Sequence, residues 1–347
     1  MTLRVGLIGY GLAGRVFHAP LLQAAGFEVT RVATGRSDEI ARDLPAAIVV
    51  SDPISLATCV DVDLVVIASP NDTHYPLAMA ALRAGRAVVI DKPFTTTVAE
   101  ADELIATAQT HGCLLSVFHN RRWDSDFLTL KSVIARGDLG EVVSYQCRFD
   151  RFRAEVRDRW REQSIPGAGL FFDLGPHLID QALQLFGWPD WLHADMQYQR
   201  AGTQVDDGFQ LTMGKGRQRI LLGGTMLAAA PEPKFVVHGT AGSFVKSGID
   251  VQEVQLKAGL RPGDAGFAEE PASDAAHVTK VRGENFETAV IPTFRGEYSA
   301  YYAGIRAAME GNASQPPVLA QQARDTMRII EAARRSHRDG VRISLAE

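Results

Sequence analysis

The chain has 347 residues, with 36 Lys and Arg against 41 Asp and Glu, and therefore a net charge of −5. This length suits two domains, and the small acidic excess argues against nucleic acid as a partner. Met1-Thr2 leads straight into an apolar strand-like run, and no apolar stretch approaches the ~18 residues that a membrane helix needs. The three cysteines have no metal-ligand spacing, so no metal site is expected. The sequence predicts a cytoplasmic protein without membrane contacts.

A glycine-rich turn lies close to the N-terminus, between the strand-like run Leu3–Ile8 and the helical pattern Arg15–Ala25. It has the G-x-G-x-x-G spacing, and its residues are Gly9, Tyr10, Gly11, Leu12, Ala13 and Gly14. In this context the first glycine allows a tight turn, the second admits a pyrophosphate, and the third lets helix and strand pack closely. The free N–H groups of the helix N-terminus favour phosphate. We therefore expect these six residues to bind a dinucleotide cofactor.

Strand-like and helical patterns then alternate as far as about residue 120. The strand-like runs are Phe27–Ala33, Ala46–Val50, Asp63–Ala68, Ala87–Ile90 and Leu114–Val117. The helices between them have recognisable ends. Thr97 and Glu100 form a capping box, and Gly112 closes the same helix. This alternation predicts an α/β fold with a doubly wound parallel sheet, the Rossmann arrangement, in residues 1–120.

The end of the second strand bears on the choice of dinucleotide. NAD-binding versions place Asp or Glu there to hold the ribose 2′-hydroxyl, whereas this chain has Ala33-Thr34-Gly35-Arg36-Ser37. An arginine beside a hydroxyl suits a 2′-phosphate, and the following Asp38 and Glu39 are expected in the first turn of the next helix. We therefore expect Arg36 and Ser37 to bind NADP(H) in preference to NAD(H), which remains the alternative cofactor. Otherwise Arg36 is only a surface charge.

Two further segments follow strands, at the sheet edge where open α/β sheets bind ligands. One contains Ser69, Pro70, Asn71 and His74. Asn71 is expected either to reach the nicotinamide ribose or to cap its helix. The other is Val88–Phe94, where a buried β-branched run stops at Asp91 and Lys92. We expect both segments to line the cofactor site. Lys92 is then aimed at the bound ligand, unless it is a solvated charge at the end of a strand.

After Trp123 the pattern changes to apolar-rich segments joined by short turns. They are Glu141–Phe149, Trp191–Gln199, Phe209–Met213, Arg219–Leu227 and Phe235–Val245. Consecutive strands without long intervening helices predict antiparallel pairing. Ala258–Glu284 is expected to be a long irregular loop, and a last helix is expected over about 320–337. We therefore expect a second, α+β domain over 121–347 for substrate binding and oligomerisation, with a last helix that is a candidate to pack back on the first domain.

Asp173 and His177 lie four residues apart, which places them on one face of a helix. Pro176 is tolerated only in or before a first turn, so the helix is expected to begin there and to run to Phe186. Removal of hydride from a carbinol needs a group that takes the hydroxyl proton. A histidine suits this near neutrality, and a neighbouring carboxylate orients it. The alternative is a purely structural pair. Asp180, one turn further along, is expected on the helix surface; the alternative is that it orients His177.

Together, the glycine turn, the segment 69–74 and Asp91-Lys92-Pro93 resemble the Gfo/Idh/MocA family of NAD(P)-dependent sugar and polyol oxidoreductases. The family usually has Glu-Lys-Pro, so Asp91 is a charge-conserving departure. Within the family, the segments 118–124, 150–153, 159–162 and 173–177 look like the NADP-dependent scyllo-inositol dehydrogenase branch. The likeness extends over essentially the whole chain. It implies a large, open, mostly antiparallel sheet in the second domain, whose outer face forms a homodimer or homotetramer.

The resemblance implies a dehydrogenase that acts on the CH–OH group of a cyclic polyol, between an inositol and an inosose. As a hypothesis, Lys92 holds the reacting oxygen, His177 accepts its proton with help from Asp173, and the hydride passes to NADP. The order of proton transfer between Lys92 and His177 is open. The alternatives are an aldose, sugar-acid or cyclic-diol dehydrogenase of the same family, and a non-catalytic NADP-binding regulator.

A polyhydroxylated ring needs many hydrogen-bond donors and an apolar face to lie on. The candidate substrate contacts are His119, Asn120, Arg122, Arg153, Trp160 and Arg161. The arginine-rich run from Arg148 to Arg161 also suits an anionic substrate, such as a sugar phosphate or a sugar acid. Alternatively, it is a solvated loop whose charges are balanced by its own Glu and Asp residues. One residue of the group Tyr298, Tyr301 and Tyr302 is a candidate to close the pocket.

Overall fold

The computed structural model describes residues 2–345, with the side chain of Trp160 outside the described part, and it divides into two units. The first consists of Met1–Trp123, Gln252–Ala268 and Glu297–Met327. The second consists of Asp124–Val251, Glu269–Gly296 and Arg328–Glu347. Two later segments of the chain thus belong to the first unit, in addition to the N-terminal region. Among the described residues, no helix combines the length and the hydropathy of a membrane span.

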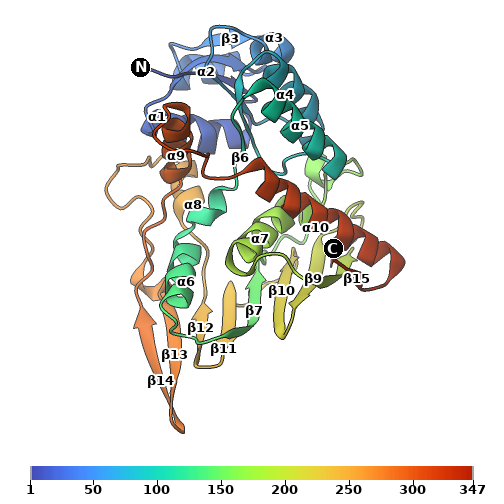
Figure 1. Cartoon of the computed structure of the whole chain (residues 1–347), viewed down its shortest axis with the longest axis vertical. Helices are drawn as coiled ribbons and strands as arrows, with labels where there is room; N and C mark the ends of the chain where they lie inside the picture. Colours follow the sequence, from blue (N-terminus) through green and yellow to red (C-terminus); the bar gives the residue numbers. More distant parts are fainter. Residues whose placement is uncertain (1, 346–347) are drawn as a thin grey trace. The chain divides into compact units, whose positions relative to one another are not determined.

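The first unit is built on a six-stranded parallel sheet with the order β3-β2-β1-β4-β5-β6 (Figure 1). Its strands are β1 (Arg4–Ile8), β2 (Glu28–Ala33), β3 (Ile48–Val50), β4 (Leu64–Ile67), β5 (Ala87–Ile90) and β6 (Leu115–Val117). From β1, the strands β2 and β3 lie on one side of the sheet, and β4, β5 and β6 lie on the other. The predicted doubly wound fold is therefore confirmed, and its strand order reverses between β1 and β4, where such sheets bind ligands.

Helices connect these strands. They are α1 (Ala19–Ala24), α2 (Ser37–Asp43), α3 (Pro53–Ala57), α4 (His74–Arg83) and α5 (Val98–His111), joined later by α8 (Gln252–Lys257) and α9 (Ser299–Met309). The predicted capping box is confirmed, since Thr97 and Glu100 bond each other's backbone N–H groups at the start of α5, and Gly112 ends this helix with a φ of 62°. The helix after the glycine turn differs from the expectation, because it opens with a π-helical turn, η1 (Ala13–His18).

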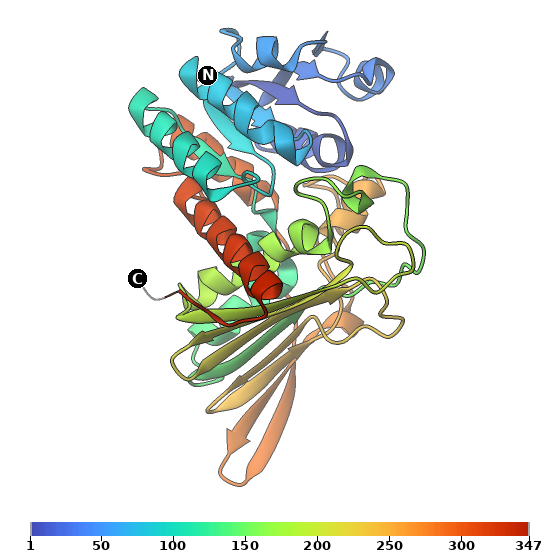
Figure 2. The same cartoon turned by 90° about the vertical axis from the view of Figure 1, so that its right-hand side faces the viewer.

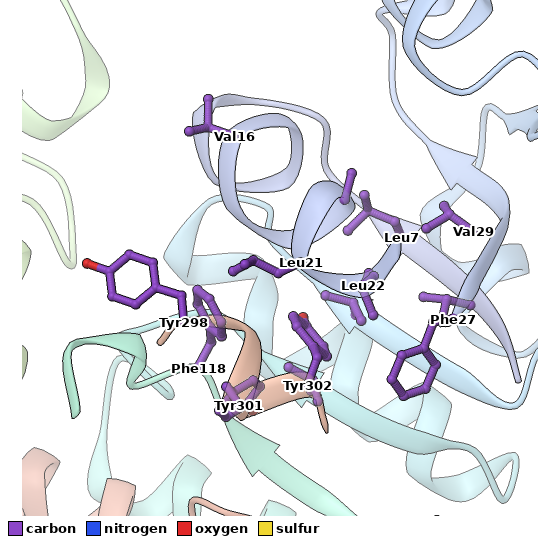
Figure 3. Close-up of a cluster of buried hydrophobic side chains, with 14 of the residues drawn as sticks. Leu7, Val16, Leu21, Leu22, Phe27, Val29, Phe118, Tyr298, Tyr301 and Tyr302 are labelled. Atoms are coloured by element: carbon purple, nitrogen blue, oxygen red, sulfur yellow. The ribbon is translucent and has the colours of Figure 1, made fainter. Parts of the chain in front are cut away.

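Aromatic side chains fill the core of the first unit next to the first helix (Figure 3). Tyr298, Tyr301 and Tyr302 have 0% exposed surface. The ring of Tyr301 packs edge to face against Phe118 and Tyr302, and the Tyr302 hydroxyl lies 2.6 Å from Nδ1 of the buried His18. The expectation that one of these tyrosines closes a pocket is therefore wrong, because all three are packed inside the core.

The second unit contains a nine-stranded sheet with the order β14-β13-β12-β11-β7-β10-β9-β8-β15 (Figures 1 and 2). Its strands are β7 (Val142–Arg148), β8 (Trp191–Gln197), β9 (Gly208–Lys215), β10 (Gln218–Thr225), β11 (Phe235–Gly239), β12 (Gly242–Lys246), β13 (Ala276–Arg282), β14 (Asn285–Ile291) and β15 (Ile343–Ser344). Neighbouring strands are antiparallel except for β7 and β10. The predicted large, mostly antiparallel sheet is confirmed.

Helices cover one face of this second sheet. The longer ones in the unit are α6 (Ser125–Ala135), α7 (Leu170–Phe186) and the part of α10 (Ala320–Asp339) that begins at Arg328. Figure 2 shows α7 lying along the sheet. Residues of β8 alternate between buried and exposed, as expected when only one face of a sheet is covered. The shorter turns of the chain are η2 (Asn71–Thr73), η3 (Asn120–Trp123), η4 (Trp160–Glu162) and η5 (Ala272–Asp274).

The irregular loop expected over 258–284 is only partly present. Its last part forms β13, which pairs with β12 on one side and with β14 on the other. The composition of the segment is rich in Gly, Pro and charge, which favours a loop. The neighbouring strands override this local preference, because they supply a complete set of backbone hydrogen bonds.

Candidate active site

The glycine turn of the first unit follows β1. Gly9 has a φ of 95°, and a Cβ at this position would lie 2.5 Å from the carbonyl oxygen of Ala68. A Cβ at Gly14 would lie 2.1 Å from the carbonyl oxygen of Gly9. These two positions therefore require glycine. At Gly11, by contrast, a Cβ would meet nothing within 4 Å. The backbone is open there, so the turn fits a dinucleotide pyrophosphate.

The end of β2 carries an arginine that already has a carboxylate neighbour. Nη1 of Arg36 donates to Oε1 of Glu39 at 2.7 Å, in an exposed ion pair. Ser37 is the first residue of α2, and Asp38 and Glu39 lie in the first turn of this helix, as expected. A 2′-phosphate at this place would compete with Glu39 for the guanidinium. Exposed pairs of this kind contribute little free energy, so the competition is not prohibitive.

Lys92 follows β5, and its neighbour Asp91 is a partly buried anion. The backbone N–H of Lys92 donates to Oδ1 of Asp91 at 2.9 Å, and Nε2 of His18 lies 3.7 Å from the same oxygen. Burial acts to raise the pKa of Asp91. The hydrogen bond and charge of His18, with the charges of Lys92 and His74, outweigh burial, so the pKa lies below its ordinary value. The bond between Lys92 and Pro93 is a cis peptide. Asp91 thus anchors the turn that presents Lys92.

His74, the first residue of α4, links the turns that follow β4 and β5. Its Nδ1 lies 2.9 Å from the carbonyl oxygen of Pro93, and its Nε2 lies 3.0 Å from that of Ser69. The side chain is buried, and burial lowers the pKa of His74. Asn71 is also buried, in the turn between Pro70 and α4. From the sequence we expected His74 to line the cofactor site. In the structure, both of its ring nitrogens face backbone carbonyl groups of the two turns.

Three of the candidate substrate contacts lie in the first unit, directly after β6. His119, Asn120 and Arg122 are all buried. Nη1 of Arg122 donates to Oε1 of Gln322 at 2.9 Å. The guanidinium of Arg122 is thus held in place by a side chain of the same unit, as expected for a residue that positions a ligand or for one that stabilises the fold.

The helix α7 of the second unit begins earlier than the sequence predicts. Its first residue is Leu170, and Pro176 lies inside it. Gly169, just before the helix, has a φ of 98°. The carboxylate of Asp206, from the connection between β8 and β9, accepts a hydrogen bond from the N–H of Phe171 at 2.6 Å. This distant residue satisfies an N-terminal donor of the helix, which no local pattern indicates. The predicted start at Pro176 is therefore wrong.

Asp173 and His177 lie one helical turn apart on α7. His177 is 6% exposed, whereas the side chain of Asp173 is about a quarter exposed. Nε of Arg161 lies 3.6 Å from Oδ1 of Asp173, so an arginine of the preceding segment neighbours this carboxylate. Asp180 is 2% exposed, and the expectation that it lies on the helix surface is wrong. The helix is buried on nearly all sides along this stretch, which leaves no solvated face for Asp180.

The arginine-rich segment before α7 contains the remaining candidates. Arg153 and Arg161 are partly buried, and the side chain of Trp160 lies outside the described residues. Nε of Arg159 donates to Oε1 of Glu162 at 2.7 Å. The predicted internal balance of charge thus holds for some of the arginines.

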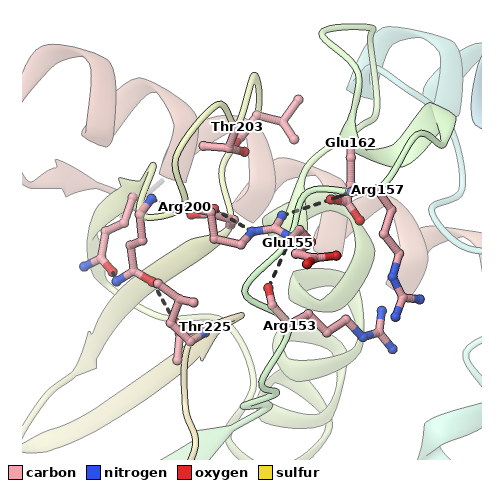
Figure 4. A network of polar contacts seen from close by, with 12 residues as sticks. Arg153, Glu155, Arg157, Glu162, Arg200, Thr203 and Thr225 are labelled. Carbon is pink, nitrogen blue, oxygen red and sulfur yellow. Dashed lines mark hydrogen bonds and ion pairs between the residues drawn. The ribbon is translucent and has the colours of Figure 1, made fainter.

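Arg200 and Asp207, two buried charged residues from the chain between β8 and β9, were not identified from the sequence (Figure 4). Nothing in their local sequence indicates that they meet this segment.

Comparison with known proteins covers both units. Residues 3–119 match the oxidoreductase family model for the NAD-binding Rossmann fold, and residues 131–345 match the model for its C-terminal alpha/beta domain. The chain is 47% identical to the uncharacterized oxidoreductase YdgJ of Escherichia coli K12, covering 99% of each chain. It is 39% identical to scyllo-inositol 2-dehydrogenase (NADP+) IolW of Bacillus subtilis 168, covering 97% of this chain and 94% of that relative.

Two solved structures of related proteins have the same fold as this chain over nearly its full length. The structure of yvaA from Bacillus subtilis superposes with a TM-score of 0.96 at 39% identity, covering 99% of this chain and 98% of the other. The structure of YPO2259 from Yersinia pestis superposes with a TM-score of 0.95 at 46% identity, covering 100% and 98%.

Proposed function

The chain belongs to the Gfo/Idh/MocA family of oxidoreductases, and we propose that it is an NADP-dependent dehydrogenase of a cyclic polyol, acting between an inositol and an inosose. The observation that carries this proposal is the presence of Lys92 after β5 together with Asp173 and His177 one turn apart on a buried helix. These are the residue types that dehydrogenation of a carbinol requires. The likeness to a relative named as an NADP-dependent scyllo-inositol dehydrogenase supports the choice of substrate and cofactor.

The first unit would hold the cofactor through the backbone at Gly11 and through Arg36 and Ser37. When bound, NADP supplies the hydride acceptor. Arg36 would exchange its exposed pair with Glu39 for the 2′-phosphate, which offers a doubly charged partner for the guanidinium fork. Residues 33–37 contain no carboxylate that would repel this phosphate.

In the proposed mechanism, the ammonium group of Lys92 donates a hydrogen bond to the reacting oxygen and stabilises the developing alkoxide. Nε2 or Nδ1 of His177 accepts the hydroxyl proton, and Asp173 stabilises the resulting imidazolium. Nε of Arg161 lies 3.6 Å from Oδ1 of Asp173, so a positive charge faces that carboxylate. Asp91 fixes the backbone from which Lys92 projects.

A second candidate function is oxidation or reduction of a sugar acid or an aldose by the same groups. The arginine-rich segment beside Asp173 favours it, since guanidinium groups suit a carboxylate of the substrate. A catalytically silent, NADP-binding regulator is a weaker candidate, because such a protein has no use for Lys92, Asp173 and His177 together.

A substrate and cofactor screen tests the proposal. The absorbance of the reduced nicotinamide would be followed with NADP and with NAD, using inositols, aldoses, sugar acids and sugar phosphates. We expect turnover of an inositol, with a higher kcat/KM for NADP than for NAD. Turnover of an aldose or sugar acid alone would favour the second candidate. NADPH binding without turnover of any substrate would contradict an enzymatic function.

A further inference from the structure

His18 lies in the core of the first unit, next to the turn that presents Lys92. Its side chain is fully buried, and its ring packs on Phe118, with 4.4 Å between the two ring centroids. Nδ1 lies 2.6 Å from the hydroxyl oxygen of Tyr302, and Nε2 lies 3.7 Å from Oδ1 of Asp91. His18 thus joins a tyrosine of the core to the residue that precedes Lys92.

Tyr302 determines which nitrogen of His18 carries the proton. Its side chain is fully buried, and Nδ1 of His18 is the one hydrogen-bond partner of its hydroxyl among the described residues. Burial raises the pKa of Tyr302 well above its ordinary value, so the hydroxyl keeps its hydrogen. A buried hydroxyl that donated to nothing would cost free energy, and Nδ1 therefore accepts this hydrogen. The proton of the neutral imidazole is then on Nε2, the nitrogen that faces Asp91.

The carboxylate of Asp91 connects this pair to Lys92. Oδ1, the oxygen that faces His18, also accepts the backbone N–H of Lys92 at 2.9 Å. Burial raises the pKa of Asp91, but the contact with His18 and the charge of Lys92 act in the opposite direction and outweigh it, so the group is ionised at neutral pH. Three contacts therefore lead from the hydroxyl of Tyr302, through His18 and Asp91, to the backbone of Lys92.

The backbone that carries His18 is itself unusual. His18 is the last residue of the π-helical turn η1, in which the N–H of Ala19 bonds to the carbonyl oxygen of Gly14, five residues earlier. Such turns are rare and are frequent at functional sites. Ala13 and Gly14, at the other end of the same turn, belong to the residues expected to bind the cofactor. One short turn thus carries both the end of the cofactor site and the histidine that contacts Asp91.

Packing alone does not require these polar groups. Burial of an imidazole and a hydroxyl costs free energy that apolar side chains of similar shape avoid. Tyr301, the neighbour of Tyr302 and equally buried, bonds to Ser116 at 2.9 Å, and Ser116 in turn donates to the carbonyl oxygen of Val318, so its contacts end within the core. The contacts of Tyr302, by contrast, continue to the turn of Lys92.

We propose that His18 and Tyr302 are positioning residues for Lys92. Tyr302 holds His18 with its proton on Nε2, this N–H fixes the carboxylate of Asp91, and Asp91 fixes the backbone from which Lys92 projects. Because a displacement of about 1 Å at a reacting group can lower a rate about 10²-fold, loss of this support should lower kcat. The inference rests on the proposed function, since turnover depends on this support only if Lys92 is catalytic.

Two substitutions of His18 separate its two contacts. Glutamine offers an N–H group at the position of Nε2 but no acceptor at that of Nδ1, whereas asparagine offers an acceptor near Nδ1 but no N–H at Nε2. With the substrate found in the screen, we expect kcat of H18Q to exceed that of H18N about tenfold, at similar KM. The Kd for NADPH reports whether η1 has moved. Equal kcat in the two variants would overturn the proposal, and so would a loss of NADPH binding in H18N as large as its loss of kcat.

The adjacent tyrosines provide a matched pair of variants. Y302F removes the hydroxyl that fixes the proton of His18, and Y301F removes an equally buried hydroxyl whose partner is Ser116. We expect Y302F to lower kcat about three- to tenfold without a change in KM, and Y301F to leave it within about twofold. Thermal unfolding checks that the two variants lose similar stability. Equal effects of Y302F and Y301F on kcat would show that only the core is disturbed and would overturn the proposal.

A labelling experiment reports the position of Lys92 without turnover. At one fixed pH, an amine-reactive ester modifies the lysines, and mass spectrometry compares Lys92 with Lys131, an exposed lysine of α6. We expect the ratio of the two labelling rates to change about threefold or more in H18N and in Y302F, and to stay constant in Y301F. A constant ratio in all three variants would overturn the proposal.

The variant K92A separates this inference from the proposed function. Near-normal turnover of K92A would contradict the catalytic role of Lys92, while a changed labelling ratio in H18N would still show that His18 positions Lys92. A loss of turnover in K92A that H18N and Y302F do not share would contradict the positioning role alone. The two failures therefore give different results.

Discussion

The carboxylate of Asp206 lies 2.6 Å from the backbone nitrogen of Phe171 and accepts its hydrogen bond. A residue of the connection between β8 and β9 thereby fixes the first turn of the helix that carries Asp173 and His177. Two side chains with proposed catalytic roles depend on this contact for their position, although neither touches Asp206 in any described interaction.

The free energy of unfolding should change with pH as the carboxyl group of Asp206 ionises. Burial raises its pKa from 3.8 to about 6, against the hydrogen bond from Phe171 and the charge of Arg334. A carboxyl whose folded pKa is raised contributes stability that is fully present below pH about 4 and is lost as the pH rises through about 6. Relative to D206N, we expect the wild type to lose on the order of 2 kcal/mol between these pH values. Urea unfolding of both proteins at several pH values measures the difference, and parallel stability curves would contradict the assignment.

Gly169 should tolerate no side chain. A Cβ at this position would lie 2.2 Å from Oδ1 of Asp206, and the φ of 98° is unfavourable for other residues. Gly202 has a φ of 77° but open space around its Cβ position, so G202A carries backbone strain without the clash. We expect G169A to be destabilised by about 2 kcal/mol or more, and G202A by about 1 kcal/mol. Thermal unfolding measures both, and equal losses would show that Asp206 moves aside at no cost.

Replacement of Lys92 should remove turnover and leave cofactor binding intact. We expect K92A to lower kcat by about 10²- to 10³-fold, because the reacting oxygen loses its charged donor. Stopped-flow or steady-state absorbance of the reduced nicotinamide measures the loss, and NADPH fluorescence provides the binding control. Near-normal turnover with normal substrate binding would show that Lys92 is not catalytic.

Replacement of His177 should lower turnover as strongly as replacement of Lys92. Replacement of Asp173 should lower it less. We expect H177A to lower kcat by about 10²- to 10⁴-fold as the proton acceptor is lost, and D173N to have a smaller effect. Because D173N keeps the shape of the side chain, it separates the loss of charge from a loss of packing. If D173N and H177A together were no worse than H177A alone, the two residues would act as one unit. Fully multiplicative losses would contradict their coupling.

Cofactor preference should depend on Arg36 and, with the opposite sign, on Glu39. We expect R36A to weaken NADPH binding about 10- to 100-fold while NADH binding changes little. E39Q removes the carboxylate that now holds Arg36 at 2.7 Å, and should tighten NADPH binding by a few fold. Fluorescence titration with both cofactors measures these constants. Equal weakening of NADPH and NADH in R36A would mean that Arg36 does not contact the 2′-phosphate.

Much of the first unit could be predicted from local patterns. The glycine turn, the alternating strands and the capping box at Thr97 each depend on residues close together in the sequence. The start of α7 could not be predicted in the same way, since Pro176 suggests a local beginning and Asp206 overrides it from a distant part of the chain. Likewise, the surroundings of Arg153 depend on Arg200, which the sequence gives no reason to place there.

By itself, the sequence determined the type of chemistry available to this protein: a dinucleotide turn at Gly9 to Gly14, a lysine after a buried strand, and an Asp-His pair at helical spacing. These features are local, because backbone geometry alone relates residues a few positions apart. Only the tertiary structure decided how those groups are supported. Asp91 is anchored by His18, and the arginine-rich segment is held by the buried Arg200 from the connection between β8 and β9. Such contacts join residues far apart in the chain, and their free energy exists only once the core has formed.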